Sequence, residues 1–200
     1  HGETSPLSDA CRRALSAAEE ILAATGDPQK SDFYLDRACY TEMLDTAKNS
    51  GSDFLLGYVQ LQIDAANLKS AVRALRMKKD NDFLKGALLS GGNVSPESIL
   101  SCTMAGGSLA GVFTGALSDA AALGDTVKKG GRQTEFEKAV DNALCAYLQK
   151  SRMVSFGDSV LVAYAAAKEN EITAARIIMS GRLGGVSTDS IRERLRDPYV

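Results

Sequence analysis

The side chains able to carry out catalysis are few and scattered in this chain of 200 residues. Its one histidine is His1, and its four cysteines, Cys11, Cys39, Cys102 and Cys145, form no Cys-x-x-Cys pair. A zinc site needs such ligands at short spacing, and nucleophilic catalysis needs a nucleophile beside a base. The sequence therefore predicts no catalytic, cofactor-binding or metal-binding residue. The cysteines are expected to be reduced and buried, as in a cytosolic protein.

A glycine-rich segment, Met104–Gly111, has a faint likeness to a phosphate-binding loop. It follows no predicted strand and lacks the Gly-Lys-Ser/Thr ending that such loops need. Carboxylate pairs such as Glu19 and Glu20 lie in predicted surface helices, where nothing marks them as an acid and base couple. The net charge of −2 also argues against general nucleic-acid binding, which needs an excess of basic residues. We expect no small-molecule substrate and no nucleic-acid partner.

Polar side chains instead border the apolar face of a long helix predicted over Asp53–Met77. The apolar residues step by four and three positions, so they share one face: Leu61, Ala65, Leu68, Val72 and Leu75. Two polar rows border that face, with Gln60, Asp64 and Asn67 on one side and Lys69, Arg73 and Arg76 on the other.

A second long helix, predicted over Asp158–Met179, has a similar apolar stripe. Its members are Leu161, Ala165, Ile172, Ala175 and Met179. Lys168 falls in the middle of this stripe, and Glu171 lies beside it at i+3. The two charges form either a solvated gap or a buried pair facing a partner, and burial is costly unless both charges are satisfied.

The elements that must position these residues are expected to be helices throughout, so the predicted fold class is all-α. Alanine and leucine dominate, tryptophan is absent and only four prolines occur. The remaining helices are predicted over Leu7–Thr25, Leu35–Asn49, Asp82–Leu89, a segment begun by Ser95 and Pro96, Leu109–Leu123, Glu135–Lys150 and Thr188–Arg196.

Two stretches read almost alike, Gly91–Ile99 and Leu183–Ile191, and each contains a glycine pair. Other landmarks recur in the same order, with Asp36 returning as Asp141 and Asp53 as Asp158. Each stretch contains a serine expected to cap a helix, Ser95 and Ser187. The repetition predicts two tandem, related helical bundles over residues 1–105 and 106–200, stacked to form a curved binding surface.

The segment Ile99–Ser118 contains no charged residue and carries Gly107, Gly111 and Gly115 at the spacing by which membrane helices pack. Its glycine, serine and threonine content makes it only weakly apolar for a membrane span. A connection between the repeats is favoured, followed by a helix whose glycine face allows another backbone to approach. We expect no direct membrane span.

The run Gln62–Arg76, with Ile63-Asp64, Asn67-Leu68-Lys69 and Arg73, resembles the I-D-x-x-N-L-K-x-x-x-R helix of a rotary-ATPase family, the C subunits of V-type and A-type ATPases and ATP synthases, whose eukaryotic members are d subunits. The tail is similar to that family's K-E-x-E-I-x-x-x-R-I-I-x-x-G-K/R-L and I-R-x-R-L-x-x-x-Y-V motifs, over Lys168–Leu183 and Ile191–Val200. The resemblance covers nearly the whole chain.

This resemblance implies the last two of three related units in a funnel-shaped fold, without the first. It implies a non-catalytic rotor component of the central stalk, cytoplasmic and peripheral to the membrane, which couples the rotating axle subunits to the membrane ring. Candidate residues for its polar socket are Gln60, Asp64, Asn67, Lys69, Arg73, Arg76, Lys168, Glu171 and Arg176.

Two alternatives stay open at this stage. Each socket candidate could instead make a cap or salt bridge within the chain, which would contribute about 0 to 1 kcal/mol at the surface. The whole chain could also be a freestanding helical repeat scaffold that uses the same concave surface for an unrelated protein partner.

Overall fold

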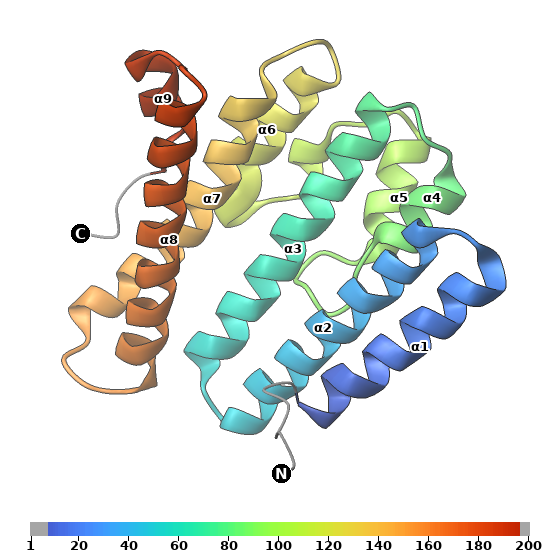
Figure 1. Ribbon diagram of the computed structural model, residues 1–200, viewed down its shortest axis with the longest axis horizontal. Helices are drawn as coiled ribbons and strands as arrows, with labels where there is room; N and C mark the ends of the chain where they lie inside the picture. Colours follow the sequence, from blue (N-terminus) through green and yellow to red (C-terminus); the bar gives the residue numbers. More distant parts are fainter. Residues whose placement is uncertain (1–7, 197–200) are drawn as a thin grey trace.

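The computed structural model describes residues 8–196, and every regular element within that range is helical, which confirms the all-α prediction (Figure 1). The α-helices are α1 (Asp9–Thr25), α2 (Pro28–Ser50), α3 (Asp53–Arg76), α4 (Asn81–Ala87), α5 (Pro96–Met104), α6 (Ser118–Val127), α7 (Gln133–Gln149), α8 (Asp158–Leu183) and α9 (Thr188–Arg194). Short 3-10 turns lie at Leu109–Gly111, Gly115–Leu117 and Lys150–Met153.

The helix starts follow from local capping chemistry. The hydroxyls of Ser95 and Ser187 accept hydrogen bonds from the backbone N–H groups of Ser98 and Ser190, at 3.2 and 3.3 Å. The prediction that both serines are N-caps is confirmed. Pro28 occupies the first turn of α2, so this helix begins at Pro28 rather than at the predicted Leu35.

Other predicted helix ends shift by a few residues. The helix α8 continues to Leu183 instead of stopping at Met179, and α9 ends at Arg194 rather than Arg196. The predicted helix start at Leu7, and the motif residues Tyr199 and Val200, lie outside the described residues.

The helix α3 lies at the centre of the molecule and contacts α2, α4, α5, α6, α7 and α8. Its predicted stripe is confirmed, since Leu61, Ala65, Leu68 and Val72 are buried and Leu75 packs against them. The largest apolar cluster joins these residues to others beyond residue 105, among them Phe113. The division into units 1–105 and 106–200 therefore remains a prediction, with one core that crosses the proposed boundary.

The stripe predicted for α8 does not face the core. Leu161 is 72% exposed, Ile172 53% and Met179 64%, whereas the buried positions of this helix are Ser159, Ala163 and Ala166. Small residues face inward because α8 packs closely onto α7 and α3. The sequence pattern predicted the helical period of α8 correctly, but it assigned the wrong face of the helix to the core.

The segment after α5 is not the predicted helix Leu109–Leu123. Two 3-10 turns occupy its first part, and the α-helix begins only at Ser118. Gly115 has φ +77°, a left-handed conformation that interrupts an α-helix. A Cβ on Gly111 or Gly115 would meet nothing within 4 Å, so no backbone approaches these two glycines as expected. Only Gly107 of the series is close to another backbone atom, since its Cβ would lie 3.3 Å from the carbonyl oxygen of Cys102.

The cysteines match their prediction in part. Cys145 is buried, Cys11 and Cys102 are half-buried and Cys39 is exposed, and none of the four forms a disulfide within residues 8–196. Within residues 8–196, none of the helices has the length and apolar character required to cross a bilayer.

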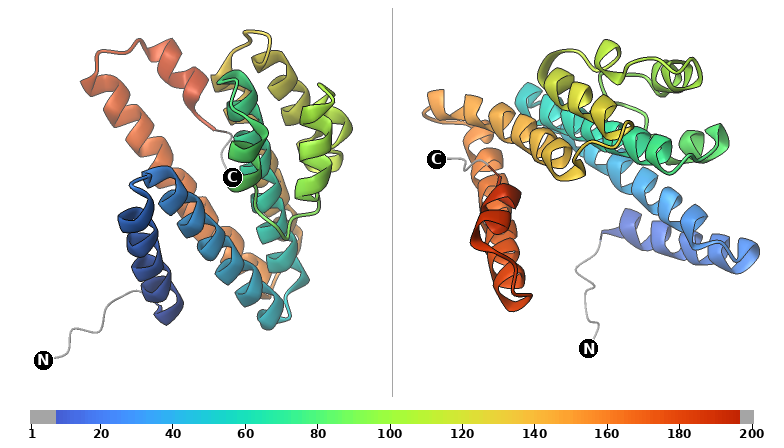
Figure 2. Two further views of the ribbon diagram at one scale, coloured as in Figure 1. Left: turned by 90° about the vertical axis from the view of Figure 1, so that its right-hand side faces the viewer. Right: turned by 90° about the horizontal axis from the view of Figure 1, so that it is seen from above.

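The helices form a curved layer. Seen from above, α1 and the α8–α9 hairpin lie at opposite ends of the molecule and on the same side of the central helices (Figure 2). The α8–α9 hairpin is joined to the rest through a small apolar cluster of Leu148, Ala163 and Ala166, against which Phe54 and Tyr58 pack. This placement leaves one long face of α8 without neighbours among the described residues.

Candidate partner-binding site

A basic cavity of about 720 Å³ lies between the α8–α9 hairpin and the adjoining ends of α3 and α7. Its lining includes four arginines, which come from α3, α8, α9 and the residues after α9: Arg76, Arg176, Arg194 and Arg196. Glu137 is the one carboxylate among the lining residues. We call this space the arginine cavity.

A smaller cavity of about 240 Å³ adjoins it along α3. Lys69 and Arg73 line this second space, together with Arg76, Gln133 and Glu137, and the last three residues line both. The row Lys69, Arg73 and Arg76 predicted on α3 therefore does come together beside α7, and it continues into the arginine cavity through Arg76. Arg176, predicted from a distant part of the chain, joins it there.

Asp141 on α7 ties the basic residues to one another. Its carboxylate accepts from Lys69 Nζ at 2.7 Å and from Arg196 Nε at 2.6 Å. The Asp141 side chain is 29% exposed. Because Lys69 belongs to α3 and Arg196 follows α9, this half-buried carboxylate links Arg196 to the central helix.

The arginine side chains of the cavity differ in whether other described residues bind them. Arg76 donates to Gln133 Oε1, and Gln133 Nε2 in turn donates to Glu137 at 2.7 Å. Neither Arg176 nor Arg194 has a hydrogen-bond or ion-pair partner for its guanidinium within residues 8–196. Among residues 8–196, no carboxylate therefore competes with an incoming anion for these two guanidinium groups.

Asp64 and Asn67, from the other predicted row, are used inside the chain. Asn67 is 0% exposed and exchanges hydrogen bonds with the backbone N–H and carbonyl of Leu89, both at 2.8 Å. Asp64 is 3% exposed and accepts from the backbone N–H groups of Asn93 and Val94 at 3.0 Å. These two side chains hold the loop that precedes α5, so they present little surface to a partner. Gln60, the third member of the row, is half-buried.

Gly92 is required at the Asp64 contact. A Cβ on Gly92 would come within 2.1 Å of Asp64 Oδ1, a distance that no side chain tolerates. The glycine pair recognised in the sequence therefore lets the loop backbone approach the carboxylate on α3.

Lys168 and Glu171 on α8 form an exposed ion pair with Nζ and Oε2 2.8 Å apart. Their side chains are 51% and 64% exposed. Of the two alternatives left open by the sequence, the pair is therefore solvated within this chain. The hydrogen bond to Glu171 and the charge of that residue raise the pKa of the Lys168 ammonium. Both residues lie outside the lining of the arginine cavity.

Asp125 on α6 holds a second glycine-rich loop. It accepts from Lys128 at 2.8 Å, from the Ser108 hydroxyl at 2.5 Å and from the backbone N–H groups of Leu109 and Ala110. Burial acts to raise its pKa, but these hydrogen bonds outweigh burial and lower the pKa to about 2. Part of the segment that faintly resembled a phosphate loop is thus held by a carboxylate.

Sequence reasoning missed Asp141, Arg194 and Arg196. The last two stand in the tail motif on which the family resemblance was based, and Asp141 was seen only as a landmark of the repeat. Each residue therefore lay in a recognisable sequence pattern. No local pattern, however, could predict that α7 and the residues after α9 lie side by side. Chemically, the arrangement can bind anions by charge-assisted hydrogen bonds from guanidinium groups. No cluster of three or more His, Cys, Asp or Glu side chains suited to a metal ion occurs in the described part of the chain.

Comparison with known proteins assigns the chain to a family. The chain is 26% identical over 197 residues to the C subunit of the V-type sodium ATPase of Enterococcus hirae, covering 96% of this chain and 58% of that protein. It is 28% identical over 201 residues to the C subunit of the A-type ATP synthase of Haloferax volcanii, covering 90% of this chain and 53% of that protein. The chain thus spans between half and three fifths of the length of these relatives.

No solved structure matches the chain. The sequence profile of the ATP synthase (C/AC39) subunit family, however, matches residues 3–194, which is nearly the whole chain. This match agrees with the two motifs quoted from the long helix and the tail, and it confirms the resemblance. The chain belongs to the ATP synthase (C/AC39) subunit family.

Proposed function

We propose that this chain is a non-catalytic central-stalk subunit of a V-type ATPase or A-type ATP synthase, which couples the rotating axle to the membrane ring. The observation that carries the proposal is the family match over residues 3–194. Its partners would be the axle subunits and the ring, and its place would be the cytoplasmic face of the membrane, at the periphery.

The architecture suits such a role. Transmission of torque requires a stiff body, and α3 supplies one because it packs against six other helices. It also requires a polar surface that seats another protein of the stalk. The arginine cavity offers that surface, since α3 and α7 line it together with the α8–α9 hairpin, and it holds guanidinium groups without partners among residues 8–196.

Co-purification tests the proposal. The tagged chain is expressed with the axle and ring subunits of its own rotary ATPase, and the complex is isolated from solubilised membranes. We expect the axle and ring subunits to be recovered, and the isolated chain to show no ATP hydrolysis. Recovery of unrelated proteins in their place would support the freestanding scaffold, and turnover by the isolated chain would contradict a non-catalytic role.

A matched pair of variants sharpens the test. Arg73 is exposed, lines the smaller basic cavity and has no ion-pair partner among residues 8–196, whereas Lys30 is an exposed cation on α2, away from both cavities. Arg73→Glu is expected to reduce recovery of the partner subunits, and Lys30→Glu to leave it unchanged. Equal recovery with both variants would show that the smaller cavity is not part of the surface that binds the partner subunits.

A further inference from the structure

The arginine cavity has an apolar wall beside guanidinium groups that form no ion pair with another described residue. Arg176 on α8 and Arg194 on α9 supply guanidinium groups that no side chain within residues 8–196 neutralises. Ile177, Val186 and Ile191 line the same space. An occupant that satisfies both kinds of surface must itself be anionic on one side and apolar on the other.

The positions of the charges also restrict the occupant. Arg176 and Arg194 belong to the α8–α9 hairpin, while the far wall carries Arg76 and Glu137, which are both connected to Gln133. Carboxylates of an occupant would therefore meet the hairpin wall, and Glu137 would repel them from the α7 wall. The cavity volume of about 720 Å³ admits several side chains rather than a single small ion.

We propose that the arginine cavity binds an acidic, amphipathic helical segment of a partner protein, with Arg176 and Arg194 pairing to its carboxylates and Ile177, Val186 and Ile191 covering its apolar residues. Guanidinium groups bind carboxylates through paired, charge-assisted hydrogen bonds. An amphipathic helix laid in a groove is a common mode of recognition between proteins. The identity of the partner as a component of the stalk rests on the proposed function, but the chemistry of the site does not.

Binding of a defined probe tests this inference. The probe is a fluorescein-labelled helical peptide with glutamate and leucine residues on adjacent faces, and the control peptide has glutamine in place of every glutamate. Fluorescence anisotropy with the full chain is expected to show binding of the glutamate peptide that weakens as salt increases, because salt screens exposed charges. The glutamine peptide is expected to bind at least about tenfold more weakly.

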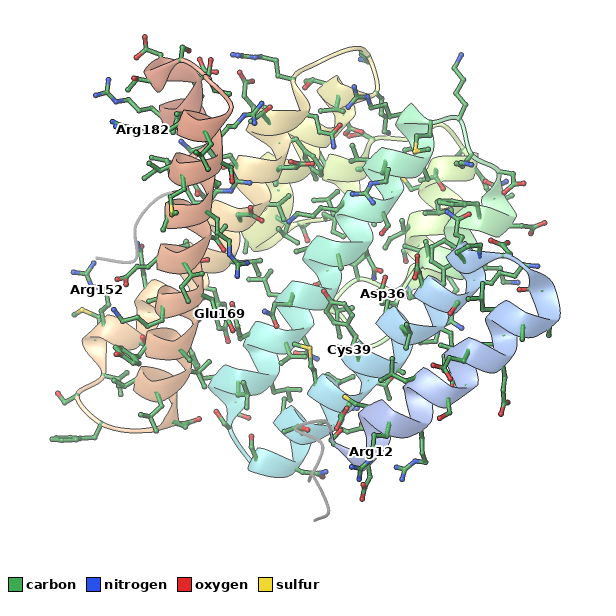
Figure 3. All side chains as sticks on the ribbon, in the orientation of Figure 1. Arg12, Asp36, Cys39, Arg152, Glu169 and Arg182 are labelled. Carbon is green, nitrogen blue, oxygen red and sulfur yellow. The ribbon has the colours of Figure 1, made fainter. Side chains whose placement is uncertain are left out.

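Variants locate the binding. The double substitution Arg176→Glu with Arg194→Glu is expected to weaken binding of the glutamate peptide by at least about tenfold. Arg152→Glu is the matched control, since Arg152 is exposed, does not line the cavity and lies well below Arg182 in the view of Figure 3. It is expected to change binding by less than about twofold. Far-UV circular dichroism checks folding, and Arg176→Gln with Arg194→Gln replaces the reversal if that variant does not fold.

Three outcomes would overturn the inference. Equal binding of the glutamate and glutamine peptides would show that carboxylates are not recognised. Equal loss with Arg152→Glu would show that general charge, not the cavity, is responsible. Tighter binding of inorganic tripolyphosphate at the same arginines would make the cavity a phosphate site.

The inference and the proposed function fail in different ways. If the chain co-purifies with axle and ring subunits but the double reversal has no effect on peptide binding, the inference fails and the function stands. If the peptide binds as expected while no component of a rotary ATPase is recovered, the site is real and the stalk role is wrong.

Discussion

The two longest helices, α3 and α8, have similar lengths of 24 and 26 residues and very different surroundings. Each begins at an aspartate, Asp53 and Asp158, and the predicted duplication pairs them. Ten residues of α3 are buried, but only Ser159, Ala163 and Ala166 of α8 are buried. The difference shows that an apolar stripe becomes core only where neighbouring helices reach it.

The same contrast applies to their polar residues. On α3, Asp64 and Asn67 are turned inward and hold the loop ahead of α5. On α8, Lys168 and Glu171 pair with each other in solvent. A helix surrounded by other helices uses polar side chains as internal ties, whereas a peripheral helix leaves them available to solvent or to a partner.

The largest difference between the helices is expected for truncation of a leucine. Leu68→Ala on α3 should lower the free energy of unfolding by about 2 to 5 kcal/mol, because it leaves a void around a side chain that is 0% exposed. Leu161→Ala on α8 should change it by less than about 0.5 kcal/mol, because Leu161 is 72% exposed. Urea unfolding measures both, and similar losses would break the comparison.

The second difference concerns a matched pair of asparagines. Asn67→Ala should destabilise the fold by roughly 2 to 3 kcal/mol, because the backbone N–H and carbonyl of Leu89 lose their partners in a buried setting. Asn170→Ala on the exposed face of α8 should have no comparable effect. Hydrogen exchange would add detail, with faster exchange of the Leu89 amide expected in Asn67→Ala alone.

A smaller effect is expected from acid at Asp125, which ties a loop to α6 as Asp64 ties one to α3. The folded pKa of Asp125 is about 2, below the ordinary value of 3.8. Its contribution to stability is therefore full above about pH 4 and is lost as the pH falls toward 2. The gap in stability between the wild type and Asp125→Asn should close over this range in denaturation experiments. A constant gap from pH 7 to pH 2 would argue against the ion pair and hydrogen bonds as its source.

The smallest difference is expected for two lysines. Lys69→Met removes a half-buried ion pair to Asp141 that connects α3 with α7, and should cost up to about 1 kcal/mol. Lys168→Met removes an ion pair in solvent and should leave the thermal midpoint unchanged. Calorimetry of the two variants would show whether the burial of an ion pair determines how much it contributes to stability.

Much of the fold could be predicted locally. The caps Ser95 and Ser187, the period of the α3 stripe and the motifs of Gln62–Arg76 and the tail were each readable within a few turns of helix. The glycine segment around Gly111 and Gly115 was misread because uncharged, small residues are compatible with a helix and with tight turns alike. The site was predicted only in part. Lys69, Arg73, Arg76 and Arg176 meet around the two cavities, but Asp64 and Asn67 face inward.

The amino-acid sequence by itself determined that the chain is helical, where most helices start and to which family it belongs, because helix period, capping and motifs depend on neighbours along the chain. Tertiary structure alone decided which stripe is buried and which arginines stand together. Burial and the meeting of Arg76, Arg176 and Arg194 depend on helices separated by about a hundred residues, whose packing no local pattern specifies.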